Sequence, residues 1–183
     1  MKAIILSVLF SVSLISILPA ETCREVVRDA SGRIVQTIDR QKQSGGAVHA
    51  VTRDASGRII GTANSQTSGG STRTDFRDAS GRMTGSATTN AANTGSSHTT
   101  YRDASGRMAG SADTSKVAGT ASRTQFRDAS GRVTGSESTN HTSTGTATST
   151  QRDASGRLTG SSTGSGRCQG VVKVPIPPAD TRK

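Results

Sequence analysis

Polar and apolar residues follow one another in a pattern that recurs about every 25 residues. The string Arg-Asp-Ala-Ser-Gly-Arg occurs six times, and every copy is identical. A large apolar residue follows each copy, and a residue that favours β-structure precedes most of them. A fixed period of this length is typical of repeat architectures. The copies begin at Arg28, Arg53, Arg77, Arg102, Arg127 and Arg152.

The residues after each string alternate as they do in β-strands. With the opening Arg as position 0, an apolar residue stands at +6, Gly at +8 in five of the six copies, and Ala at +10 in the middle copies. These positions are expected to share one face, with the +6 side chain buried and the Gly admitting another backbone. The +6 residues are Ile34, Ile59, Met83, Met108, Val133 and Leu158. The +8 glycines are Gly61, Gly85, Gly110, Gly135 and Gly160.

The string itself predicts a hairpin turn. An Asp at +1 accepts hydrogen bonds from backbone N–H groups two residues on, and a Gly at +4 takes a positive φ without steric cost. A salt bridge from Asp +1 to Arg +5 is expected to fix the register of the hairpin. The turn residues are Asp29, Gly32, Asp54, Gly57, Asp78, Gly81, Asp103, Gly106, Asp128, Gly131, Asp153 and Gly156.

A second, glycine-containing turn follows each hairpin, so each repeat is predicted to supply two short strands. The predicted fold is all-β, with tandem hairpin repeats of about 25 residues that form a solenoid or repeat sheet. Departures from the pattern in the first and last copies, such as Gln36 and Gln151, are expected to mark capping units. The alternative is a largely disordered low-complexity chain, because Leu, Ile, Val and Phe supply only 18 of the 163 residues in 21–183.

The two ends of the chain differ from the repeats. Residues 1–20 have a basic start, an apolar stretch and a small residue at Ala20, which predicts a secretory signal peptide. We therefore expect a six-repeat β domain over 21–170, a Pro-rich basic tail over 171–183, and no transmembrane span after cleavage. The expected location is secreted, periplasmic or at the cell surface.

Cys23 and Cys168 bracket all six strings. An exported chain enters an oxidising compartment, where such a pair forms disulfides. In an open solenoid the two ends of the repeat array lie roughly 24 Å apart, too far for a bond within the chain. A bond within one molecule then needs a flexible end or a sheet that closes on itself, and it is our first expectation. Bonds between subunits, or free thiols, are the alternatives.

The net charge indicates anionic partners. The chain carries a formal charge of +10, and each copy of the string contributes two Arg and one Asp. Anionic polysaccharide, envelope polymers or nucleic acid suit such a surface, while a solvated face that keeps the protein soluble is the simpler reading. The arginines expected to contact anions are Arg33, Arg58, Arg82, Arg107, Arg132 and Arg157.

No group of residues predicts catalysis. The sequence has no arrangement typical of a catalytic triad, a carboxylate pair or a phosphate-binding loop, so we expect a protein that is not an enzyme and needs no cofactor or metal. His49, His98 and His141 have no recurring carboxylate or second His beside them and are read as surface residues.

The string resembles the YD repeat of the Rhs, teneurin and toxin-complex shell proteins, whose units centre on Tyr-Asp-x-x-Gly-Arg followed by an apolar residue. Here Arg stands in place of the Tyr, and the aromatic residue lies one position earlier, at Phe76, Tyr101 and Phe126. The resemblance covers about residues 24–173 and implies a β-hairpin sheet. The architecture is also loosely similar to that of curli-type fibre subunits.

These observations predict a secreted, non-catalytic repeat protein that is a structural or cell-surface interaction component. Two specific versions remain open. One is a monomer that binds an anionic envelope polymer or glycan through its repeated arginines. The other is a self-associating, amyloid-like extracellular fibre subunit.

Overall fold

The computed structural model describes residues 22–92, 95–117 and 119–166. The predicted signal peptide and the Pro-rich tail lie outside these ranges, as does Cys168. None of the helices among the described residues is long and apolar enough to cross a membrane.

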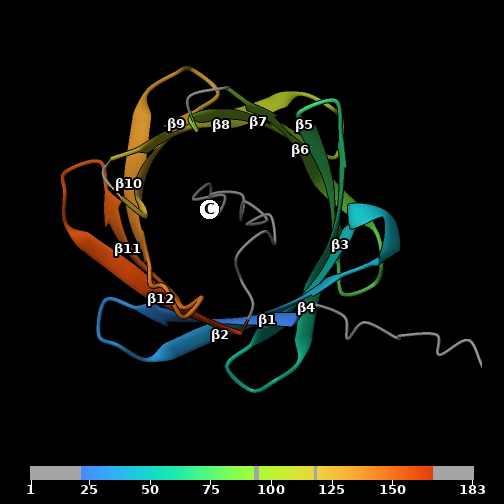
Figure 1. The fold of residues 1–183 in the computed structure, drawn as a ribbon. Coiled ribbons are helices and arrows are strands. Elements are labelled where there is room, and N and C mark those ends of the chain that lie inside the picture. The colour runs from blue at the N-terminus through green and yellow to red at the C-terminus, as the bar shows by residue number, and fades with distance from the viewer. Residues whose placement is uncertain (1–21, 93–94, 118, 167–183) are drawn as a thin grey trace, which may run out of the picture.

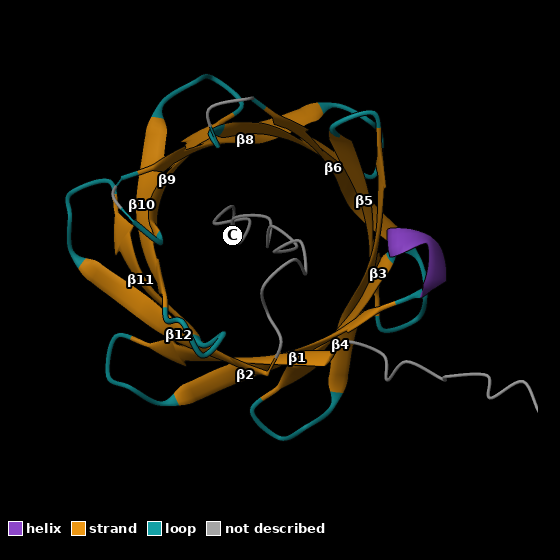
Figure 2. Cartoon of the chain, in the orientation of Figure 1, coloured by secondary structure: helices purple, strands orange, loops and turns teal. Residues whose placement is uncertain are grey.

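Twelve antiparallel strands form one closed barrel, which Figures 1 and 2 show along its axis. Strands that follow one another in the chain are neighbours, and the last strand pairs with the first. A short 3₁₀ turn, η1 (Ser44–Gly46), lies between the second and third strands. The strands are β1 (Thr22–Asp29), β2 (Ile34–Lys42), β3 (Val48–Asp54), β4 (Ile59–Ser68), β5 (Ser71–Asp78), β6 (Met83–Ala91), β7 (Ser97–Asp103), β8 (Met108–Lys116), β9 (Ala121–Asp128), β10 (Val133–His141), β11 (Ala147–Asp153) and β12 (Leu158–Gly166).

The closed barrel corrects the predicted architecture. The chain is all-β and built of hairpins, but the expected open solenoid or repeat sheet is wrong, and so is the disordered alternative. The same finding overturns the sheet implied by the resemblance to YD repeats. The first and last repeats are not caps, because β1 and β12 pair from Cys23 opposite Gly166 to Asp29 opposite Gly160. Closure joins the two edges that an open sheet would leave unpaired.

The +8 glycines set how closely neighbouring repeats approach. A Cβ atom on Gly135 would lie 2.5 Å from the carbonyl oxygen of Arg152, in the next repeat. The pairing of β1 with β12, which we call the seam, repeats this contact, since a Cβ atom on Gly160 would lie 2.5 Å from the carbonyl oxygen of Arg28. No side chain fits at that distance. The predicted role of these glycines is therefore confirmed, and the seam has the same geometry as the junctions inside the array.

Small and polar residues line much of the interior. The strands, about 4.8 Å apart and tilted by about 35–45°, enclose a diameter of roughly 24 Å between backbones. The buried apolar cluster runs around the wall, with Tyr101 the largest fully buried side chain. A second set of contacts in the wall consists of hydrogen-bonded hydroxyl pairs across neighbouring strands. The cluster comprises Val27, Ile38, Ala50, Ala63, Phe76, Ala87, Tyr101 and Ala112, with Phe126 packed against it. The hydroxyl pairs are Ser65–Thr74, Thr89–Thr99, Thr114–Thr124 and Thr139–Ser149.

One ion pair is buried beside the seam. Arg40 Nη2 lies 2.7 Å from Glu25 Oε2, and the two side chains are 3% and 7% exposed. The partners come from β2 and β1, next to the strand that closes the barrel. Removal of either partner would leave a charge inside the wall. The pair therefore favours one pairing of the first hairpin over others.

The +6 residues do not form the expected buried row. Ile34, Ile59, Met108 and Leu158 are 39–47% exposed. A β-bulge explains the error: Arg28 pairs with Ile34, but Val27 pairs with Gln36, so one residue is skipped between +6 and +8. The bulge recurs in the other hairpins and places +6 on the opposite face from +8 and +10.

Closure bears on the cysteines. Cys23 is buried and its backbone lies opposite Gly166, two residues before Cys168 in the sequence. Directly opposed residues of antiparallel strands are about 4.5–5.5 Å apart between Cα atoms. The separation of roughly 24 Å that an open solenoid would impose on the chain ends does not apply. The Cys23–Cys168 bond within one molecule stays a prediction, and the closed sheet favours it.

We expect Gly160→Ala to destabilise the barrel by about 1–3 kcal/mol, because its methyl group would push β12 from the Arg28 carbonyl. The measurement is the free energy of unfolding in urea. Thr163→Ala, at an exposed position on the same strand, is the control and should change it by less than about 0.5 kcal/mol. If Gly160→Ala were as stable as the unaltered chain, the close approach of β12 to the Arg28 carbonyl would not be needed for closure.

We expect the non-reduced protein to be a monomer, lighter by two hydrogens than its reduced form, in intact-mass and size-exclusion measurements. The double variant Cys23→Ser, Cys168→Ser should lose up to about 5 kcal/mol of stability, since the bond would close a loop longer than 100 residues. A ladder of disulfide-linked multimers would show that the thiols join different molecules instead.

Candidate anion-binding rim

Each Asp-Ala-Ser-Gly turn is held by its own atoms. In the first, Asp29 Oδ1 accepts hydrogen bonds from the backbone N–H of Ser31 (2.9 Å), the hydroxyl of Ser31 (2.7 Å) and the backbone N–H of Arg33 (3.0 Å). The N–H of Gly32 donates to the Asp29 carbonyl at 3.0 Å, and Gly32 has φ of 84°. The backbone bonds recur in all six turns. The predicted turn is thus confirmed, including the roles of Asp and Gly.

The opening Arg of each string clamps the turn. Arg28 Nη1 donates to the carbonyl oxygen of Gly32 at 2.9 Å. The other five copies repeat this bond at 2.8–3.1 Å. This guanidinium therefore has a structural task, which sequence reasoning had not assigned to it.

The closing Arg of each string has no such task. Its backbone N–H donates to the Asp carboxylate, but among the described residues none of the six closing guanidiniums has a hydrogen bond or an ion pair. The expected salt bridge from Asp +1 to Arg +5 is therefore not formed. All six side chains are exposed: Arg33, Arg58, Arg82, Arg107, Arg132 and Arg157.

Topology brings the six turns to one end of the barrel. Each joins an odd-numbered strand to the next even-numbered one, and alternate turns of an antiparallel meander lie at the same end. Figure 2 shows these loops projecting around the wall. We call the six strings together the arginine rim. With two Arg and one Asp in each, the arginine rim carries a formal charge of +6.

The Asp carboxylates stay charged under mildly acidic conditions. In four turns the Ser hydroxyl, helped by backbone N–H groups, lowers the pKa of the Asp carboxyl below its usual 3.8. The four residues are Asp29, Asp54, Asp128 and Asp153. The charge of the closing Arg lowers these pKa values further, so the Asp and the closing Arg of a turn interact over a longer distance than an ion pair.

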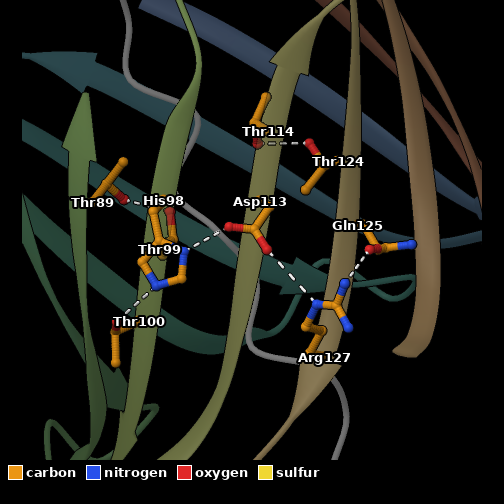
Figure 3. Close-up of polar contacts among 9 residues, drawn as sticks. All are labelled: Thr89, His98, Thr99, Thr100, Asp113, Thr114, Thr124, Gln125 and Arg127. Carbon is orange, nitrogen blue, oxygen red and sulfur yellow. Dashed lines mark hydrogen bonds and ion pairs between the residues drawn. The ribbon is translucent and has the colours of Figure 1, made fainter. Parts of the chain in front are cut away.

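A polar cluster on the outer wall was missed from the sequence. His98 Nδ1 lies 2.6 Å from Asp113 Oδ1, and Arg127 Nε lies 3.7 Å from Asp113 Oδ2 (Figure 3). Gln125 accepts a hydrogen bond from Arg127 Nη2 at 2.7 Å. His98 and Asp113 also border an open pocket of about 660 Å³. His98 is exposed, as predicted, and its contact with Asp113 is a feature that the sequence reasoning missed.

The same arrangement occurs in the first repeat. Asp39 lies 2.6 Å from Arg24 and 4.0 Å from Arg53, all on the outer wall. Asp39 and Asp113 both stand eleven residues after the opening Arg of their repeat. A comparison of residues across adjacent strands rather than along the chain would have revealed both clusters. They tie neighbouring hairpins together, and within the described part of the chain no three His, Cys, Asp or Glu residues are placed to hold a metal ion.

We expect the turns to weaken in acid. Because the folded-state pKa of these four Asp residues is depressed, their stabilisation is complete above about pH 3.8 and is lost as the pH falls through the folded values. The melting temperature, followed by circular dichroism from pH 6 downwards, should fall once the pH passes below about 4. Replacement of the four bonded Ser residues by Ala should make that fall shallower. A melting temperature that ignores pH in this range would contradict the prediction. The substitutions are Ser31→Ala, Ser56→Ala, Ser130→Ala and Ser155→Ala.

No protein-family profile and no curated protein matches the chain. A search of solved structures finds a crystal structure described as that of a "putative lipoprotein from Parabacteroides distasonis". The two chains share 12% identity with a TM-score of 0.41, over 80% of this chain and 94% of the other. A likeness of this strength carries no conclusion about fold or function.

Proposed function

We propose that the protein is an exported, non-catalytic component of the cell surface or envelope that binds an anionic polymer or glycan through the arginine rim. The observation that carries the proposal is the closing Arg of each string. It is present in all six copies, exposed in all six, and its guanidinium is not used by the turn that contains it.

The arrangement suits a polymer with repeated negative charges. An exposed guanidinium offers planar, bidentate hydrogen bonding to phosphate, sulfate or carboxylate groups. Six such groups on one rigid end bind several charges of one polymer at once, so each contact after the first is intramolecular. Weak single contacts then add up to a useful affinity.

The fibre alternative has less support. A subunit that adds strands to its neighbours needs a free sheet edge. Among the described residues every strand has a partner on both sides. Fibre growth through the sheet would therefore require the seam between β1 and β12 to open.

The test is binding of the purified protein to dextran sulfate, with neutral dextran as the ligand control. Affinity should fall steeply as salt rises, because binding releases counterions. The triple variant Arg58→Gln, Arg107→Gln, Arg157→Gln should weaken binding by about tenfold or more.

The matched control removes three exposed cations that lie outside the rim. The variant Arg73→Gln, Lys116→Gln, Arg123→Gln has the same net charge as the rim variant and should change affinity by less than about twofold. Equal losses in the two variants would mean that general charge binds the polymer, and the proposal would be wrong.

A further inference from the structure

A large apolar side chain follows each closing Arg, and most of these side chains face water. Ile34, Ile59, Met108 and Leu158 are 42%, 39%, 47% and 41% exposed. Met83 and Val133 are half-buried. The chain has few large apolar residues, and six of them lie at the rim. Exposed apolar residues that recur at the same place in every repeat, each beside an exposed cation, are a candidate interaction surface.

The stagger of the sheet explains the exposure. The ladder between β2 and β3 begins only at Gln36 opposite Asp54, and that between β4 and β5 at Gly61 opposite Asp78. Ile34 and Ile59 therefore have strand partners only within their own hairpins, and Val35 and Ile60, which the bulges skip, pair with no residue of a neighbouring strand. The hairpin tips overhang the wall of the barrel, as the projecting loops in Figure 1 show.

The apolar surface is strongest on two neighbouring hairpins. Val35 and Ile60, at +7, are 43% and 44% exposed, whereas Thr or Ala occupies +7 in the other four repeats. The hairpins β1–β2 and β3–β4 thus carry four exposed aliphatic residues, and each also carries a free closing Arg, Arg33 and Arg58. Cation and apolar side chain are adjacent in the chain at every tip.

We infer that the arginine rim docks on the surface of an anionic lipid bilayer. The apolar residues at the tips enter the boundary between headgroups and acyl chains, while the closing arginines bind lipid phosphates at the level of the headgroups. Arg suits this position because its stem is apolar and its head stays in the polar layer. The inference rests on the proposed anion-binding function and names the partner of that same surface.

Charge and apolarity together select the bilayer. A soluble anionic polymer would satisfy the arginines and leave the Ile, Val, Met and Leu side chains in water. A neutral apolar partner would bury those side chains and leave six guanidiniums without anions. An anionic bilayer provides both environments: phosphates for the arginines and, next to them, hydrocarbon for the apolar side chains. The opposite end of the barrel has one strongly exposed large aliphatic residue among those described, Val117, at 66%.

The chain contains no Trp, so a single introduced indole reports its own surroundings. The probe variant is Ile60→Trp at a rim tip, and the control is Val117→Trp at the opposite end. The ligand is a vesicle of phosphatidylcholine with roughly one-third phosphatidylglycerol. Ile60→Trp fluorescence should shift to the blue and be quenched by brominated acyl chains, whereas Val117→Trp fluorescence should not change.

A second variant separates this inference from the function on which it rests. In Ile34→Ser, Val35→Ser, Ile59→Ser, Ile60→Ser, vesicle affinity measured by co-sedimentation should fall about tenfold or more, while dextran sulfate affinity stays within about twofold. Circular dichroism confirms that the variant is folded. Vesicle binding that survives these substitutions, or indole emission unchanged on bound vesicles, would overturn lipid insertion and leave the polymer as partner. If the unaltered protein does not bind dextran sulfate, the proposed function itself is wrong.

Discussion

The rest of the structure depends on the pairing of β1 with β12. A chain so poor in Leu, Ile, Val and Phe cannot build a thick apolar core, and most of its order has to come from backbone hydrogen bonds. An open sheet of the same repeats would leave one row of N–H and C=O groups unpaired at each edge. Closure pairs both rows at once. The contact of Gly160 with the Arg28 carbonyl makes the seam equivalent to the junctions between inner repeats. Closure therefore needs no special segment.

The composition of the interior follows from the closed wall and the low content of large apolar residues. In a wall of twelve strands, side chains of ordinary size do not reach across, so each needs only to pack against its neighbours along the wall. Ala and the hydroxyl pairs serve this purpose at the cost of little side-chain entropy. Phe76 and Tyr101 are the buried aromatic side chains among the described residues. The buried Glu25–Arg40 pair contributes little net stability but disfavours other pairings of the first hairpin, which matters in a chain of near-identical repeats.

Sequence reasoning succeeded where structure is local. The turn around Asp29 and Gly32 could be predicted because its hydrogen bonds lie within five residues. Closure of the barrel could not be predicted in this way. It depends on how the small stagger of each hairpin accumulates over six repeats, and no short segment of the sequence determines the total. The bulge at Val35 could not be predicted either, because one skipped residue places Ile34 on the other face and a strict two-residue alternation does not allow for it. The six closing arginines were singled out from the sequence, yet only the structure separates their free guanidiniums from the clamping ones at position 0.

The stagger that closes the barrel also frees the tips for a partner. Because each tip projects beyond the wall, the side chains at +5 and +6 add almost nothing to the interior, and stability alone would accept many residues there. The six copies nevertheless all have Arg at +5 and a large apolar residue at +6, while +7 varies between Val, Ile, Thr and Ala. Exposed Ile and Met at a solvated tip favour aggregation unless something covers them. The proposed partner, with phosphates outside and hydrocarbon beneath, would contact both side chains in every copy.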